Sequence, residues 1–163
     1  MTGKILHIYS KLKISNKFGL MKPEVKQALL NRNGIEGDYN HFRATKRGNN
    51  PDMALLVLPI EIIHKLNEEG WPINIGDLGE NLVTEGVPID NFIPNLMIDI
   101  GTVKIQLSYK CDPCYKLHSL PYVGKKHGVE FVKTMLGRRG WYARVLKGGR
   151  ISSGDTCSFE ETN

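Results

Sequence analysis

The stretch LMIDIGTVKIQLSY, residues 96–109, carries the pattern that decides the fold. Its second half alternates strictly, with three apolar residues on one face and three polar residues on the other: Val103, Ile105 and Leu107 against Lys104, Gln106 and Ser108. An alternation with a period of two is typical of a strand that buries one face. Gly101 and Thr102 supply a turn, so the stretch predicts two consecutive strands, over 96–101 and 103–109.

Strand patterns recur on both sides of this stretch, over residues 3–10, 52–59, 140–149 and 156–160. Six short strands separated by glycine-bearing turns predict an α+β fold that is predominantly β, arranged as a barrel or folded sheet with a few short helices. Helices are expected over 59–70 and 128–137, which have apolar residues at helical spacing and end in glycine. We also expect a helix over 22–34, where Pro23 fits a first helical position.

The composition indicates an ordinary globular protein. The chain has 163 residues, of which 40% are hydrophobic and 24% charged, and we expect a single domain over 1–163. No apolar run is long enough to cross a bilayer. A lysine interrupts the apolar N-terminal run, which argues against a signal peptide, so a cytoplasmic location without membrane association is expected. With only three cysteines, free thiols are expected rather than disulfides.

The formal net charge of +5 indicates an affinity for anions. Nucleic acid, an acidic membrane surface and a small phosphorylated ligand all fit this charge, and so does simple solubility. The basic residues are scattered and lack the aromatic spacing of an RNA-binding sheet, so no nucleic-acid partner is expected.

The stretch SYKCDPCYKL, residues 108–117, contains two thiols three positions apart. They fit a redox pair, half a zinc site, a single reactive thiol or small core residues. A zinc site would have to recruit His118 and Cys157, because no second Cys-x-x-Cys is present. A thioredoxin-like pair would open a helix, and no helical period follows here. We expect Cys157, in the closing strand, to be buried, and Cys114, in a polar loop, to be accessible.

Two glycine-rich segments add polar side chains, namely GIEGDYNHF (34–42) and GDLGENLVTEGVPI (76–89). Gly37 and Gly79 permit a close approach of backbone to a ligand. Taken singly, each segment fits an ordinary turn just as well. Neither contains a Walker A loop or a dinucleotide-binding fingerprint.

In combination these segments carry a resemblance. Gly-Asp-x-x-His, then Gly-Glu-Asn-Leu, then a strand running into Pro-Cys-x-x-Leu is similar to the MOSC family, the module named after the C-terminal domain of molybdenum cofactor sulfurase. The closing GWYARVLKGGRISSGD (140–155) resembles the end of that family's pattern. The resemblance spans residues 34–155 and implies a stand-alone MOSC protein with a barrel-like α+β fold.

The resemblance implies an association with the molybdenum cofactor (molybdopterin), an anionic pterin that carries a dithiolene and a phosphate. In one group of the family, the cysteine that corresponds to Cys114 ligates molybdenum, and the metal reduces N-hydroxylated compounds with electrons from a donor protein. In another group that thiol is proposed to carry a persulfide for molybdenum enzymes. A non-catalytic cofactor-binding module is the third possibility. A thiolate suits the first two roles, because it is a soft ligand and also accepts sulfane sulfur.

The resemblance also implies the other site residues. We expect the two glycine-rich segments to converge on the Cys114 loop, with cofactor contacts from Gly37, Asp38, His41, Gly79, Glu80 and Asn81. Lys116 would favour the thiolate, and Arg138, Arg139 and Arg144 are the candidate phosphate partners. The chain departs from the family pattern at Tyr39, Asn40 and Phe42. Cys111 lies outside that pattern, and it is either incidental or a resolving thiol for Cys114.

Overall fold

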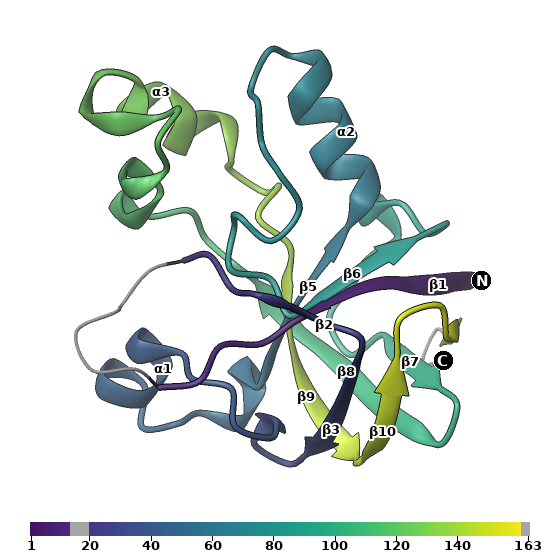
Figure 1. Ribbon diagram of the computed structural model, residues 1–163. Coiled ribbons are helices and arrows are strands. Elements are labelled where there is room, and N and C mark those ends of the chain that lie inside the picture. The colour runs from purple at the N-terminus through teal and green to yellow at the C-terminus, as the bar shows by residue number, and fades with distance from the viewer. Residues whose placement is uncertain (14–19, 161–163) are drawn as a thin grey trace.

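A closed β-barrel dominates the computed structural model, which describes residues 1–13 and 20–160 (Figure 1). Seven of the described strands form a hydrogen-bonded ring in the order β1 (Thr2–Tyr9), β11 (Thr156–Glu160), β7 (Met97–Ile100), β8 (Val103–Lys110), β9 (Trp141–Lys147), β5 (Leu55–Pro59) and β6 (Leu82–Glu85), which pairs again with β1. The expected fold class, predominantly β with a few short helices, is confirmed.

The ring is mixed in direction. β5 and β6 run parallel, whereas the other neighbours in the ring are antiparallel. A parallel pair needs a crossover between its strands, and here α2 (Ile60–Glu68) and the loop after it provide one. This loop contains the Gly-Glu-Asn-Leu segment, so the crossover delivers that segment to the start of β6.

The barrel interior is filled by the alternating residues of the strands. β7 and β8 form the predicted hairpin around Gly101 and Thr102, with Ile98 opposite Ile105. The three apolar residues predicted to face inward, Val103, Ile105 and Leu107, are completely buried. Cys157 of β11 lies in the same core, as expected.

A second apolar cluster lies outside the ring. α2 buries Ile60, Ile62, Ile63 and Leu66, and α3 (Gly124–Thr134) buries Phe131 against this cluster. The helices predicted over 59–70 and 128–137 are therefore confirmed, although α3 begins four positions before the predicted start. No described helix is long and apolar enough to cross a membrane.

The helix predicted over 22–34 is wrong. These residues form β2 (Glu24–Val25), β3 (Gln27–Asn31) and the start of β4 (Gly34–Ile35). β3 pairs with β10 (Gly149–Ser152) and with β4 in a small separate sheet, and β2 pairs with β1. Ala28 and Leu30 are buried, while Leu29 between them is 45% exposed, which is the alternation of a strand.

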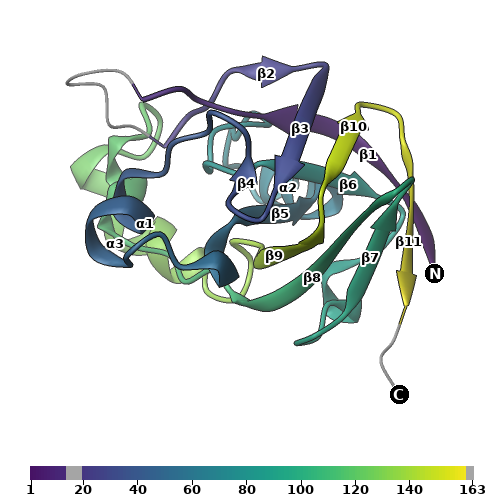
Figure 2. The same cartoon turned by 90° about the horizontal axis from the view of Figure 1, so that it is seen from below.

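Short helices complete the structure. They are α1 (His41–Lys46) and the 3₁₀ helices η1 (Pro51–Met53), η2 (Ile89–Asn91) and η3 (Tyr115–Ser119). Figures 1 and 2 show α1 and α3 on one side of the molecule, whereas the start of β1 and the end of β11 lie on the other side. Since η3 packs against α3, the segment after the Cys-x-x-Cys pair belongs to the helical side.

Candidate functional site

The Cys114 loop leaves the barrel where β8 ends. The amide of Cys111 still donates to the carbonyl of Gly140, 2.9 Å away, which keeps Cys111 in the barrel wall. Cys114 then caps η3, and its carbonyl accepts from the amide of Leu117 at 3.1 Å. The His118 ring of η3 fits against α3 only because Gly128 has no side chain.

The three thiols differ in exposure. Cys114 is partly exposed, whereas Cys111 and Cys157 are buried, so the expected contrast between Cys114 and Cys157 is confirmed. The Cys111 thiol donates to the hydroxyl of Tyr142 at 3.2 Å, and burial raises its pKa above the ordinary value. A buried thiol with a raised pKa is a poor nucleophile, so Cys114 is the more reactive member of the pair.

Arg139 stands directly behind the Cys114 thiol. Its side chain is buried, with the residue only 6% exposed, and one terminal nitrogen lies 3.9 Å from the sulfur and 3.3 Å from the carbonyl of Asp112. The other terminal nitrogen donates to the carbonyl of Leu78 at 3.2 Å, and Nε has no hydrogen-bond partner. The guanidinium therefore connects the thiol to the loop before Gly-Glu-Asn-Leu and leaves one buried donor for an incoming acceptor.

Glu80 shapes that loop from inside. Its carboxylate is completely buried and accepts from the amides of Gly76 at 2.6 Å and Leu78 at 3.1 Å. Burial raises the pKa of Glu80, while these two bonds oppose the shift. Gly79 has a φ of 81°, in the left-handed region, as the tight turn requires. Both carboxylate oxygens of Glu80 are thus engaged by backbone amides, and they hold the turn that contains Leu78.

Asn81 and Asp38 bring the two glycine-rich segments together. The Asn81 side chain donates to Asp38 at 2.9 Å and to the carbonyl of Tyr9 at 3.1 Å, and it accepts from the amide of Leu56 at 3.1 Å. Lys22 donates to the same Asp38 carboxylate at 2.8 Å. Since Arg139 links Leu78 to Cys114, the expected convergence of the three motifs is confirmed.

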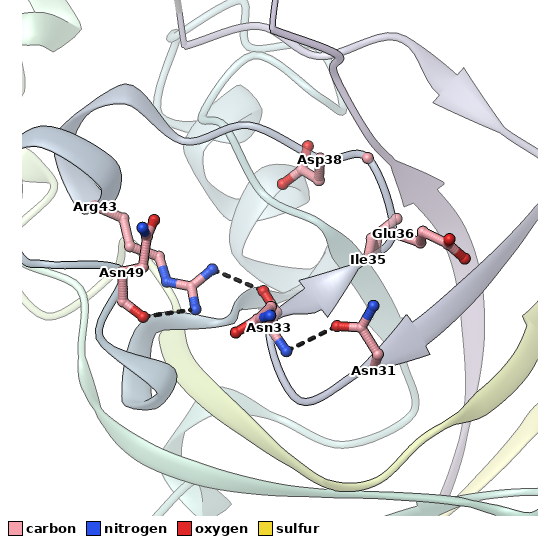
Figure 3. Close-up of a pocket in the computed structure, with 8 residues that line it drawn as sticks. Asn31, Asn33, Ile35, Glu36, Asp38, Arg43 and Asn49 are labelled. Atoms are coloured by element: carbon pink, nitrogen blue, oxygen red, sulfur yellow. Dashed lines mark hydrogen bonds between the residues drawn. The ribbon is translucent and has the colours of Figure 1, made fainter.

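A polar hollow borders the Gly-Asp segment (Figure 3). It encloses about 340 Å³ and is lined by Asn31, Asn33, Ile35, Glu36, Gly37, Asp38, Arg43 and Asn49. The Arg43 guanidinium donates to the carbonyls of Asn33, Asn49 and Asn50, so its donors hold the surrounding loops rather than a ligand. Gly37 and Asp38 therefore stand between this hollow and the contacts with Asn81.

His41 belongs to α1 and Lys116 to η3. His41 opens α1, where its Nδ1 lies 3.2 Å from the hydroxyl of Tyr39. The Lys116 ammonium lies 5.5 Å from the centre of the Phe42 ring, over which Arg47 also sits at 5.1 Å. Phe42, a departure from the family pattern, thus joins α1 to η3 through cation–π contacts.

Two of the predicted phosphate partners are engaged elsewhere. Arg138 forms an ion pair with Glu69 at 2.8 Å, and Arg144 pairs with Asp52 at 3.0 Å. The structure does not bring either guanidinium into the contacts around Asp38 and Asn81. Lys22 joins that centre instead, and sequence reasoning missed it because it lies in the segment predicted as helix. No local signal marks it, since only the fold places it beside Asp38.

The described residues contain no group of three or more His, Cys, Asp and Glu side chains that could hold a metal ion. The zinc interpretation of the Cys-x-x-Cys pair therefore has no support from His118 and Cys157. A site that relies on one protein thiolate and on ligands brought by a cofactor does not need such a group.

The sequence resemblance implied a barrel-like fold in which three motifs converge on a Pro-Cys thiol. The structure has this arrangement. A family model for the MOSC domain matches residues 44–158, and the chain belongs to this family. The family is associated with the molybdenum cofactor.

Three relatives match most of this chain but only part of their own length. The chain is 32% identical over 141 residues to the uncharacterized protein YflK of Bacillus subtilis and 28% identical over 131 residues to the protein YiiM of Escherichia coli. It is 31% identical over 112 residues to a protein of Gibberella moniliformis named "Reductase". These matches cover 83%, 78% and 61% of the chain, but only 60%, 56% and 19% of the respective relatives.

Solved structures share the fold. The YuaD protein of B. subtilis superposes with a TM-score of 0.79 at 19% identity, over 100% of this chain and 98% of that one. YiiM of E. coli superposes with a TM-score of 0.71 at 22% identity, over 100% of this chain and 71% of that one. At these identities the likeness concerns the fold alone.

Proposed function

We propose that this protein binds the molybdenum cofactor through the Cys114 thiolate and reduces N-hydroxylated compounds with electrons from a partner protein. The observation that carries the proposal is the pairing of a partly exposed thiol with a buried guanidinium 3.9 Å away, at the point where the three family motifs meet. A relative named "Reductase" supports the reaction type.

The residues present fit the cofactor in three respects. A single thiolate is a suitable soft ligand for molybdenum. The Arg139 guanidinium, whose buried Nε has no hydrogen-bond partner, would offer a donor and a positive charge to an anionic cofactor. Asp38, Asn81 and Lys22 form a rigid polar wall for the pterin. When bound, the cofactor supplies two-electron reduction of an N–O bond.

The chain's own residues then have defined tasks. Arg139 holds the Cys114 loop in place, because its guanidinium donates to the Asp112 carbonyl and lies 3.9 Å from the Cys114 sulfur. Glu80 accepts from the amide of Leu78, the residue whose carbonyl accepts from Arg139. η3, seated on α3, holds the Cys114 backbone at the edge of the site.

The test is co-purification of molybdenum from cells with an intact cofactor pathway, followed by reduction of benzamidoxime with reduced methyl viologen as electron donor. We expect wild type and Cys111→Ser to retain the metal and reduce the probe. Cys114→Ser should lose molybdenum and activity by more than ~10-fold, since even indirect damage to a ligand costs that much.

Cys111→Ser is the matched control because it changes the other thiol of the same loop and keeps a donor for Tyr142. Equal losses in both variants would mean that the two thiols act as a unit. Cyanide-labile sulfur on Cys114 without any molybdenum would identify a sulfur carrier instead. Bound molybdenum without reduction of the probe would leave only the cofactor-binding role.

A further inference from the structure

Charge is unevenly distributed along this chain. Residues 39–50 and 113–129 each contain three Lys or Arg residues and no Asp or Glu, whereas residues 85–103 contain three Asp or Glu residues and no Lys or Arg. The basic residues are Arg43, Lys46, Arg47, Lys116, Lys125 and Lys126, and the acidic residues are Glu85, Asp90 and Asp99. The two basic stretches include α1, Cys114, η3 and the first part of α3, while the acidic stretch includes η2 and β7.

The fold places the basic and acidic stretches on opposite sides of the molecule. Figures 1 and 2 both show α1 and α3 on one side and β7 on the other, and η3 packs against α3. The side that carries Cys114 is therefore basic, and the opposite side is acidic. A charge asymmetry of this kind steers a charged partner before contact is made. It presents Cys114 to partners with a negative surface.

Two cations share one aromatic ring where α1 meets η3. The Arg47 guanidinium lies 5.1 Å and the Lys116 ammonium 5.5 Å from the centre of the Phe42 ring. Within the part of the chain that the structure describes, neither cation has a carboxylate at ion-pair distance. Tyr115, which lies between Cys114 and Lys116 in the chain, is 74% exposed. We call Phe42, Arg47, Tyr115 and Lys116 the docking face.

The docking face has the composition of a protein–protein contact. Aromatic residues and arginine are enriched in such contacts and dominate their binding energy, and Phe42 and Tyr115 are both exposed. The Cys114 loop, residues 108–117, contains a single carboxylate, that of Asp112, so the two cations of the face outnumber it. Electron-transfer proteins form small, weak interfaces of under about 1,200 Å², and such a contact needs no extended groove.

We infer that the docking face binds an acidic surface of the electron-donor protein and so brings the donor next to Cys114. The inference rests on the proposed function, which requires a protein donor, and it adds the chemistry and the position of that partner. Tyr115 and Lys116 follow the thiol directly as the first residues of η3, so a protein seated on them lies beside the site. An acidic protein is favoured over a nucleic acid, because the proposed reaction brings no nucleic acid to the thiol.

The experiment measures binding of oxidised plant-type ferredoxin, a small acidic electron-transfer protein, by surface plasmon resonance at several salt concentrations. Wild type should bind this probe. Arg47→Glu should bind it about 10-fold more weakly and with a smaller dependence on salt, because reversing a charge at an interface slows electrostatically steered association. Arg47 is the variant of choice because it is exposed and follows the last residue of α1.

The matched control is Lys147→Glu, which reverses the same charge far from the docking face. Lys147 is exposed and lies at the end of β9 opposite Trp141, whose partner Lys110 directly precedes the Cys-x-x-Cys pair. This variant should bind ferredoxin like wild type. Equal weakening in both variants, or no binding by wild type, would overturn the inference.

The class of the partner is tested with two other anionic probes. A single-stranded DNA oligonucleotide and phosphatidylserine vesicles are titrated against wild type and Arg47→Glu. Weaker binding of both probes than of ferredoxin would support a protein partner. Tighter binding of either probe, lost in Arg47→Glu, would overturn the assignment to a protein.

The reaction itself separates docking from catalysis. Benzamidoxime reduction by the molybdenum-loaded protein is compared with reduced ferredoxin and with reduced methyl viologen as donors. Arg47→Glu should lose rate only with ferredoxin, and an equal loss with both donors would overturn the docking role. Ferredoxin binding that depends on Arg47 without molybdenum retention would refute the proposed function and leave the acidic-protein site standing, whereas molybdenum retention without such binding would do the reverse.

Discussion

Asp38 connects parts of the chain that are far apart in sequence through one carboxylate. It accepts from the amide of Lys11, the ammonium of Lys22 and the side chain of Asn81. The ion pair with Lys22 is well buried, so each charge has lost most of its hydration and depends on the other. The same residue therefore stabilises the fold and borders the site.

Replacing Asp38 by Asn should lower the free energy of unfolding by about 3 kcal/mol, because the Lys22 ammonium would stay buried without its counter-charge. The double variant Asp38→Asn/Lys22→Met should recover part of this loss by removing the unpaired charge. Urea unfolding of both variants and wild type measures the difference. The control is Asp99→Asn, whose ion pair with Lys104 is 26% and 35% exposed, and which should cost no more than about 1 kcal/mol. Similar losses in Asp38→Asn and Asp99→Asn would contradict the account.

At the scale of elements, local patterns predicted the elements whose partners are near in sequence. The hairpin over 96–109 carries its own turn and its own alternation, and the structure reproduces both. The segment over 22–34 has Ala28, Leu29 and Leu30 in a row, which suits a helix as well as a strand. Part of this segment pairs with β10, which is close to the other end of the chain, and that pairing makes it a strand. No local pattern contains that information.

The candidate site also has features that local patterns predicted and features that they could not predict. The order of the three motifs predicted their convergence, and the contacts of Asn81 with Asp38 and of Arg139 with Leu78 agree. The buried position of Lys22 and the ion pairs of Arg138 and Arg144 depend on neighbours from distant segments. Long-range electrostatics of this kind follows from the fold, so sequence reasoning could not predict which basic side chains are already engaged in ion pairs.

The strand character of β3 has a direct test in two adjacent leucines. Leu30 is 2% exposed and Leu29 is 45% exposed. Leu30→Ala should cost about 2–5 kcal/mol of unfolding free energy through a cavity in the core, whereas Leu29→Ala should cost less than about 0.5 kcal/mol. Chemical denaturation of the two variants compares them under identical conditions. Comparable losses at both positions would count against the alternation that defines β3.

At the scale of the whole molecule, the closed ring separates the thiols into two environments. The pairing of β1 with β11 completes the ring and encloses Cys157 in the core, while Cys114 lies on a loop beyond the end of β8. Cys157 becomes exposed to solvent only when several strands separate cooperatively. Cys114 is accessible on its loop without such unfolding.

Alkylation of the native protein should therefore modify Cys114 more than ~100-fold faster than Cys157, because Cys157 reacts only through unfolding. Mass spectrometry of protein quenched at successive times gives the rate at each thiol. Denatured protein should show similar rates at all three cysteines, which controls for intrinsic reactivity. Native modification of Cys157 as fast as Cys114 would contradict the closed barrel.

The central claim, that the Cys114 thiolate ligates the molybdenum of the cofactor, is tested most directly by X-ray absorption at the molybdenum edge. Wild type and Cys111→Ser should show a protein thiolate sulfur in addition to the two dithiolene sulfurs. Cys114→Ser should lose that additional sulfur or retain no molybdenum at all. A wild-type spectrum without a third sulfur, or one that Cys114→Ser reproduces unchanged, would contradict the account.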